Sequence, residues 1–143
     1  MIYSKLTRKA MKICFEKHKD QVDKGGMPYI FHPLYVAESM EDEDSVIVAL
    51  LHDVIEDTDM TIEELRAHGF SDVVIEAIKL LSRDMSMSYM NYIRSLKGNP
   101  IARAVKIADL KHNSDLSRLD VVSDKDIYRV KKYQKALKIL MDN

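Results

Sequence analysis

The sequence predicts an all-α protein: a single compact bundle of about seven or eight helices that spans residues 1–143. Apolar residues recur at helical spacings of three and four, and strict alternation over five or more residues is hard to find. The 4 glycines and 3 prolines fall between the apolar segments. A chain of 143 residues that is 46% hydrophobic fits one domain with an ordinary core. No repeat, low-complexity tract or linker interrupts it.

Local signals place the expected helices in order along the chain. Gly25-Gly26 and Pro28 mark a loop after the first helix, and the run Val46–Leu51 forms the apolar part of the third. Thr61, with Glu64 three residues later, has the pattern of a capping box, and Gly69 is placed like a helix C-cap. The expected helices cover residues 2–20, 30–40, 43–56, 61–68, 71–82, 86–97, 100–116 and 123–141.

The last two helices have the clearest boundaries. In Gly98-Asn99-Pro100, one helix can stop and the next can begin, with asparagine as the N-cap and proline at the first helical position. Ser123 and Asp126 repeat the capping-box spacing in a weaker form. The apolar residues that keep to one face of these helices are Ile101, Ala104, Val105, Ala108 and Leu116, and then Val130, Tyr133, Leu137 and Leu140.

Charge and cysteine content limit the partners. The chain has 22 basic and 23 acidic residues and a net charge of -1, which argues against a nonspecific nucleic-acid binder. Cys14 is the only cysteine, so no intramolecular disulfide is possible and a reducing compartment is the simplest setting. The N-terminus has no apolar signal-like run, and no stretch is long enough to span a bilayer. We therefore expect a cytoplasmic protein without a membrane partner; nothing in the sequence indicates an oligomeric state.

Three segments carry potential chemistry, and the first contains His32. This histidine lies just inside an expected helix start, in Pro28-Tyr29-Ile30-Phe31-His32-Pro33. Taken alone, it is more simply interpreted as a stray histidine than as a metal ligand.

The second segment is His52-Asp53-Val54-Ile55-Glu56-Asp57, at the end of an apolar helix. His52 and Glu56 are four residues apart, as are Asp53 and Asp57, so each pair would stack on one helix face. Polar groups at the end of a buried segment are costly unless something compensates them, and a metal ion can do so. The alternative is a solvated helix C-terminus, but acidic residues there oppose the helix dipole.

The third segment, residues 105–113, places Asp109 within an apolar helix face and Asn113 one turn later. Alone it is weak, because a buried aspartate can also pair with a neighbouring lysine. Joined to the other segments, it completes a set of two histidines and two carboxylates. Such mixed nitrogen and oxygen ligands suit Mn, Fe, Zn or Co better than Ca.

These segments resemble a known family. The order His…His-Asp…Asp is the pattern of HD domains, and the sequence is more narrowly similar to the hydrolase domain of the RelA/SpoT family, above all its stand-alone small alarmone hydrolases. The similarity covers residues 14–133. The matching segments are Pro28-Tyr29-Ile30-x-His32-Pro33, Leu51-His52-Asp53-x-x-Glu56-Asp57 and Val105-Lys106-x-Ala108-Asp109-x-x-x-Asn113. Because the sequence ends at Asn143, no synthetase domain is expected.

The resemblance implies a reaction and a cofactor. The family removes the 3′-pyrophosphate of (p)ppGpp, giving GDP or GTP and pyrophosphate, usually with Mn²⁺. Glu56 and Asp57 match the acidic pair that positions and activates the attacking water. The implied metal ligands are His32, His52, Asp53 and Asp109.

The resemblance also implies which residues contact the nucleotide substrate. Asn113 matches a residue near the ribose. Arg129 and Tyr133 match an Arg-x-x-x-Tyr pair on the last helix that lines the substrate cleft. Lys24 and Tyr29 occupy matching positions before His32.

Two positions depart from the family pattern. Asp23 stands where the full-length enzymes carry an arginine that helps to hold the guanine, and Asp115 stands where they commonly have another arginine. Both changes replace a positive charge with a negative one. They motivate two alternatives: action on another nucleotide, such as the 2′-phosphate of NADPH or a 5′-mononucleotide, or a non-catalytic module that senses a nucleotide.

Overall fold

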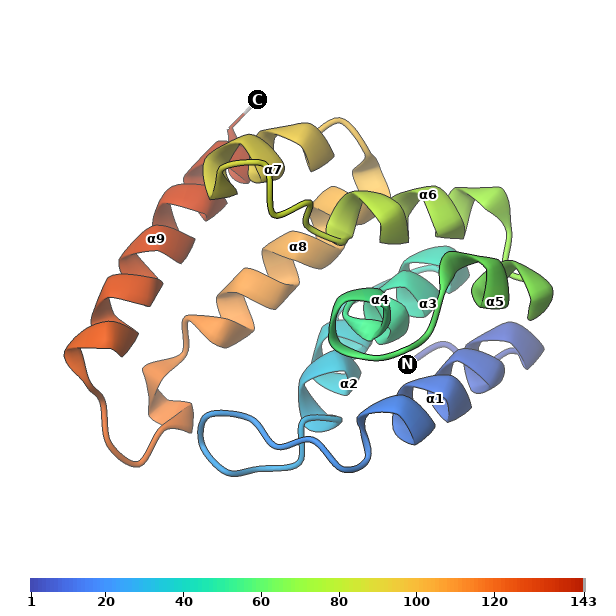
Figure 1. The fold of residues 1–143 in the computed structure, drawn as a ribbon, viewed down its shortest axis with the longest axis horizontal. Helices are drawn as coiled ribbons and strands as arrows, with labels where there is room; N and C mark the ends of the chain where they lie inside the picture. Colours follow the sequence, from blue (N-terminus) through green and yellow to red (C-terminus); the bar gives the residue numbers. More distant parts are fainter. Residues whose placement is uncertain (143) are drawn as a thin grey trace.

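The computed structural model describes residues 1–142, and within them the fold is all-helical (Figure 1). The predicted fold class is confirmed, since the described residues contain no strand, only an isolated bridge between Val22 and Pro28. None of the described helices is long and apolar enough to cross a membrane. The elements are α1 (Lys5–His18), α2 (Phe31–Glu38), α3 (Glu43–Leu51), α4 (Val54–Asp57), α5 (Ile62–Ala67), α6 (Asp72–Leu81), α7 (Tyr89–Leu96), α8 (Pro100–Asn113), the 3₁₀ turn η1 (Leu116–Arg118) and α9 (Asp124–Met141).

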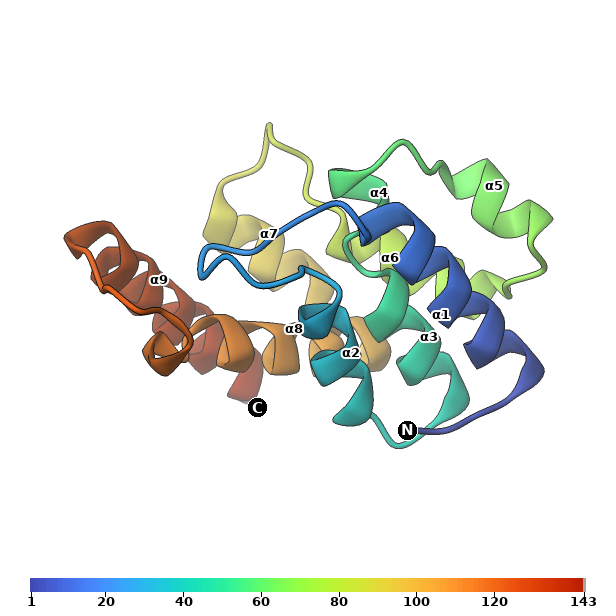
Figure 2. The same cartoon turned by 90° about the horizontal axis from the view of Figure 1, so that it is seen from below.

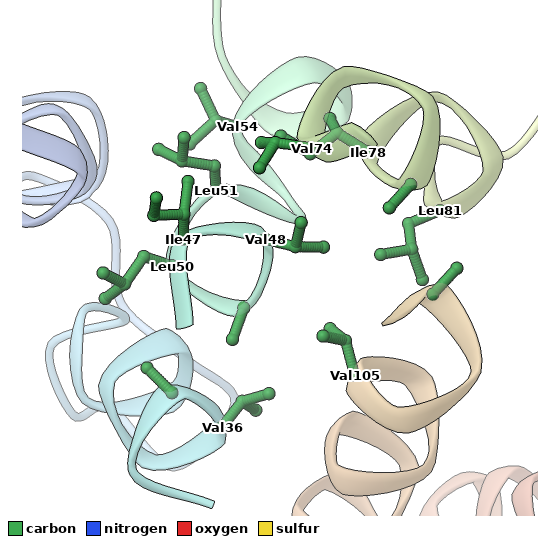
Figure 3. Packing of buried hydrophobic residues seen from close by; sticks show 14 of the residues in the cluster. Val36, Ile47, Val48, Leu50, Leu51, Val54, Val74, Ile78, Leu81 and Val105 are labelled. Carbon is green, nitrogen blue, oxygen red and sulfur yellow. The ribbon is translucent and has the colours of Figure 1, made fainter. Parts of the chain in front are cut away.

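Helix α3 is the centre of the core. Every residue from 45 to 51 is buried, because α1, α2, α6 and α8 all pack against this helix. Figure 3 shows Val48 of α3 on the side of Val36 of α2, Leu81 of α6 and Val105 of α8, and Leu51 beside Val54. A helix that is apolar on all sides must be enclosed, as this one is.

The remaining helices extend the bundle from this centre. Helix α9 lies along α8 at one side, with α7 packed against both α6 and α9 (Figures 1 and 2). The loop after α1 reaches the turn that follows α8 (Figure 1). At this approach a Cβ on Gly25 would lie 2.7 Å from the carbonyl oxygen of Arg118, so only glycine fits.

The local signals for helix ends are confirmed. Thr61 and Ser123 each form a capping box, with side chains that accept from the backbone N–H three residues on. Asn99 caps α8 with Pro100 directly after it. Gly69 follows α5 with φ +93, the left-handed conformation that suits glycine.

The prediction of one helix over 43–56 is wrong, because α3 ends at Leu51 and the short α4 begins at Val54. The His52 side chain provides the reason. Its Nδ1–H donates to the carbonyl oxygen of Ala49 at 2.6 Å, the acceptor that the Asp53 N–H would use in a continuing helix. This break also adds one helix to the expected seven or eight.

The helix predicted over 100–116 also ends early, at Asn113. The Asp115 carboxylate accepts hydrogen bonds from the backbone N–H and the hydroxyl of Ser117, and so caps the 3₁₀ turn instead of continuing α8.

Candidate metal centre and substrate cleft

Two histidines and an aspartate converge where α2, the end of α3 and α8 meet. His32, His52 and Asp109 are all buried, and one nitrogen or oxygen atom of each lies within 4.8 Å of the others. The Nε2 atom of His32 is 2.8 Å from Asp109 Oδ1, and His52 Nε2 is 3.7 Å from the same oxygen. Three residues that are far apart in sequence therefore form one buried cluster.

His52 is oriented by the backbone. Because the Ala49 carbonyl can only accept, Nδ1 of His52 carries the proton, and in the neutral ring Nε2 has the free lone pair. This Nε2 is buried and forms no hydrogen bond of acceptable geometry within residues 1–142, although Asp53 Oδ2 is 3.0 Å away. Burial alone would lower the pKa of His52, but Asp53 and Asp109 raise the pKa well above its ordinary value.

Asp109 is held by two neighbours besides the rings of the two histidines. Lys106 Nζ donates to its Oδ2 at 2.9 Å, and Asn113 donates to its Oδ1 at 2.9 Å. Burial alone would raise the pKa of this carboxyl group, but the charge of Lys106, followed by the neighbouring side chains of His32 and His52, holds the pKa well below its usual range. The carboxylate is therefore present as an anion at neutral pH.

Asp53, the fourth predicted ligand, lies beside the cluster rather than within its 4.8 Å set. Its Oδ2 accepts a hydrogen bond from the Tyr29 hydroxyl and faces His52. Burial opposes ionisation, yet the charge of His52 lowers the pKa of Asp53 to about 2. Tyr29 therefore contacts a predicted ligand as well as the cavity described below.

The donor set fits a divalent transition metal. Imidazole nitrogens and carboxylate oxygens are ligands of Zn, Mn and Fe, and a buried His52 Nε2 without a hydrogen-bond partner within residues 1–142 is an atom that a cation would satisfy. The raised pKa of His52 has the same origin, since the two carboxylates attract a positive charge to this point. The cluster is thus suited to a metal ion.

A cavity of about 220 Å³ opens directly on the cluster. Glu56 and Asp109 line it, together with the cations Lys106, Arg83 and Lys132. The Glu56 carboxylate accepts a hydrogen bond from the Arg83 backbone N–H. Partial burial raises the pKa of Glu56, with Asp53 adding to the effect and the Arg83 hydrogen bond opposing it.

Asp57 faces a different part of the protein from Glu56. Its backbone carbonyl accepts a hydrogen bond from Gln21, and the residue does not line the cavity that contains Glu56. Burial and the charge of Asp53 raise the pKa of Asp57. The two acidic residues of the expected pair therefore occupy different surroundings, since consecutive side chains of a helix point in different directions.

All five predicted substrate contacts line one cavity of about 280 Å³, next to the first. Two of them, Asn113 and Tyr133, also line the cavity that contains Glu56, so the two cavities adjoin at these side chains. The five contacts are Lys24, Tyr29, Asn113, Arg129 and Tyr133. They come from the loop after α1, the end of α8 and the first ten residues of α9.

The two departures from the family pattern both have structural roles in this cavity. Asp23 Oδ1 accepts from the backbone N–H groups of Gly25 and Met27, and its Oδ2 faces Arg118 Nη2 at 3.2 Å. Asp115 caps the 3₁₀ turn, as described above. Arg118 lines the cavity, so a guanidinium group is present there although both expected arginine positions hold aspartate.

Sequence reasoning missed His112 and Arg118, and it gave Lys106 no role at the centre. His112 Nδ1 lies 2.7 Å from His32 Nδ1, and Lys106 bonds to Asp109. The sequence could have indicated two of them, because Lys106 lies three residues before Asp109 and His112 three residues after it, a spacing that brings side chains together on a helix. No local pattern points to Arg118, whose contact with Asp23 joins segments 95 residues apart.

The fold and the cluster define an all-helical protein with a buried His–His–Asp centre of the metal-binding type. A profile of the HD domain family matches residues 10–118, and the chain therefore belongs to the HD domain family.

Curated relatives agree with this assignment. A protein of Aquifex aeolicus named guanosine-3′,5′-bis(diphosphate) 3′-pyrophosphohydrolase is 31% identical over 94% of this chain and 20% of its own length. Human guanosine-3′,5′-bis(diphosphate) 3′-pyrophosphohydrolase MESH1 is 35% identical over 71% of this chain and 64% of its own length. A Myxococcus xanthus protein named GTP pyrophosphokinase is 33% identical over 87% of this chain and 18% of its own length. The chain spans about a fifth of these two bacterial relatives.

A solved structure shares the fold. It is described as a metazoan ortholog of SpoT that hydrolyses ppGpp, and it superposes with a TM-score of 0.77 over 99% of this chain and 88% of that chain, at 23% identity. Together these comparisons confirm the resemblance on which the sequence prediction rests.

Proposed function

We propose that this chain, as a single HD-type domain over residues 1–143, is a metal-dependent hydrolase that removes the 3′-pyrophosphate of (p)ppGpp. The observation that supports this most is that Asp109 of the buried His32–His52–Asp109 cluster lines a cavity, and that this cavity adjoins a second one lined by all five expected substrate contacts. Relatives named as 3′-pyrophosphohydrolases support the same substrate. A cytoplasmic setting is part of the proposal.

The proposed ligands are His32, His52, Asp53 and Asp109, with Mn²⁺ as the proposed ion. Bound there, a divalent ion would lower the pKa of water and neutralise phosphate charge. Asp53 belongs to the ligand set because its Oδ2 lies 3.0 Å from the His52 nitrogen that faces the cluster.

In the proposed reaction a water oxygen forms a bond to the phosphorus attached to the ribose 3′-oxygen. The bond between that phosphorus and the 3′-oxygen breaks, so the 3′-oxygen of GDP or GTP is the leaving group and takes up a proton from solvent, while the phosphorus remains in the pyrophosphate product. Glu56 accepts the proton from the water, a role that suits a carboxylate with a raised pKa beside the cluster. The negative charge of Asp57 favours the protonated state of Glu56.

The chain also provides cations for the diphosphate. Lys106, Arg83 and Lys132 line the cavity with Glu56, so phosphate oxygens next to the cluster would meet three positive side chains. Burial lowers the pKa of Lys132, and Arg83, Arg129 and Lys106 lower it further, which indicates a concentrated positive potential. The nucleoside would then extend into the neighbouring cavity, toward Tyr29 and Arg129.

One observation favours a second candidate substrate. Asp23 and Arg118 form an ion pair in the nucleoside cavity. The full-length enzymes carry an arginine at the position of Asp23, so this ion pair is not expected from the family pattern. A different nucleotide, such as NADPH with its 2′-phosphate or a 5′-mononucleotide, is therefore the alternative substrate. A non-catalytic sensor is less consistent with the chain, because Glu56 lines the cavity beside the cluster.

The direct test is product release from ppGpp, pppGpp, NADPH and a 5′-mononucleotide, each with Mn²⁺ and with a chelator. Pyrophosphate from the two alarmones alone, and only with metal, would support the proposal. Phosphate release from NADPH or the mononucleotide alone would support the proposed metal site but would show that the substrate is not an alarmone. Tight nucleotide binding without any product would favour the sensor.

A further inference from the structure

His112 makes a contact that the proposed reaction does not use. Its Nδ1 lies 2.7 Å from Nδ1 of His32, while the other ring nitrogen of His32 faces Asp109. The centroids of the two rings are 5.0 Å apart and their planes differ by 10°. A nitrogen–nitrogen contact this short at that centroid separation places the rings edge to edge in nearly one plane, not face to face. This is the geometry of an in-plane N–H···N hydrogen bond.

The direction of this hydrogen bond follows from the chemistry of His32. A histidine can bind a cation through Nε2 only if that nitrogen has its lone pair free, so the proton must be on Nδ1. A hydrogen bond between two ring nitrogens needs one donor and one acceptor. With a cation on its Nε2, His32 therefore donates its Nδ1–H, His112 Nδ1 accepts, and the proton of His112 is on its Nε2.

The surroundings hold His112 in this position. The Tyr35 ring stacks on its face, with centroids 4.0 Å apart and planes at 15°. The His112 carbonyl oxygen accepts a hydrogen bond from Arg118 at 3.0 Å. Both histidines of the cluster thus have a fixed Nδ1–H acceptor: the Ala49 carbonyl for His52 and the His112 ring for His32.

We propose that His112 is a positioning residue that fixes the tautomer and ring orientation of His32 for metal binding. The inference rests on the metal site of the proposed function. Acceptors of this kind usually contribute about 10- to 100-fold to metal affinity. Here the acceptor is a neutral side chain, so it orients the ligand without adding negative charge to the centre.

The test compares three variants by their affinity for Zn²⁺ and Co²⁺, measured by competition with a chromophoric chelator. His112→Phe keeps a ring against Tyr35 and removes the acceptor, so its affinity should fall about 10- to 100-fold. His112→Asn replaces Nδ1 with an amide oxygen and should recover most of the affinity. Tyr35→Leu removes the stacking partner but keeps the acceptor, and should therefore lose less affinity than His112→Phe.

Wild-type affinity in His112→Phe, or equal losses in the Phe and Asn variants, would overturn the inference. A measurement on the wild-type protein avoids any folding defect: the imidazole ¹⁵N spectrum of the zinc-loaded protein should show His32 Nδ1 protonated and His112 Nδ1 unprotonated, and the reverse would also overturn it. The proposed function fails separately, if the wild-type protein binds no metal or releases no product.

Discussion

Replacing Lys106 with methionine should destabilise the metal-free protein strongly. Lys106 Nζ bonds to Asp109 Oδ2 at 2.9 Å, and their side chains are only 14% and 6% exposed. Methionine matches the length of the lysine stem, so the main loss is the charge that compensates a buried carboxylate. Breaking a buried ion pair by removing one partner costs about 3 kcal/mol or more. For a chain of this size that corresponds to a fall in melting temperature of about 10 °C.

The matched control is Lys79→Met. Lys79 also pairs with an acid three residues away on its helix, Glu76, at 3.5 Å, but these side chains are 48% and 59% exposed. An exposed pair of this kind contributes at most about 0.5 kcal/mol. The assay is urea denaturation of both variants and the wild type in buffer with chelator, followed by circular dichroism. If the two substitutions reduce the free energy of unfolding by the same amount, Lys106 does not compensate Asp109 as argued.

Adding a divalent metal extends this prediction. The deficit of Lys106→Met should shrink as metal is added, because a cation at His32, His52 and Asp109 compensates the same carboxylate and binds only the folded state. A deficit that is independent of metal concentration would contradict the proposed role of Asp109 as a ligand.

Four further predictions concern the site. His52→Ala should lose the metal, and metal content measured by mass spectrometry should fall toward zero. Glu56→Gln should keep the metal but lower kcat about 100-fold or more, as expected for a lost general base; steady-state kinetics with metal analysis separates the two effects. Although burial opposes it, His52 holds the pKa of folded Asp53 at about 2, below the usual 3.8. The ionised Asp53 therefore stabilises the fold above about pH 4, and this contribution is lost as the pH falls. In Asp53→Asn, the urea concentration at the midpoint of unfolding of the metal-free protein should consequently change less with pH than in the wild type. Arg118→Ala should raise KM about tenfold with kcat less affected, since a charged hydrogen-bonding group is lost from the nucleoside cavity.

Helix ends were predictable because their causes are local. The hydrogen bonds of the caps at Thr61, Asn99 and Ser123 join residues within three positions of one another, so they can be recognised in the sequence itself. The break after Leu51 has a local cause as well, but the competition between the His52 ring and the backbone for the Ala49 carbonyl depends on a rotamer that no spacing specifies.

The site was predictable only in part, for a different reason. Family resemblance identified His32, His52 and Asp109 because they form the pattern of the family. Among the groups that tune them, Lys106 lies within a matching segment and contacts Asp109 three residues away, whereas the contacts of His112 with His32 and of Arg118 with Asp23 join residues 80 and 95 positions apart. Long-range contacts of this kind depend on packing, which the sequence alone does not provide.

The position of the cluster at the end of α3 explains why these tuning groups are needed. Helix α3 is the most enclosed element of the core and ends at Leu51, directly before His52, so the Asp109 carboxylate beside it is buried and Asp53 is partly buried. A buried carboxylate without partners would disfavour folding by on the order of several kcal/mol. Lys106 offsets this loss for Asp109, and Tyr29 hydrogen-bonds to Asp53, whereas the more exposed Glu56 and Asp57 both retain raised pKa values. Of these two, Glu56 lines the cavity beside the cluster, where the proposed mechanism needs a base.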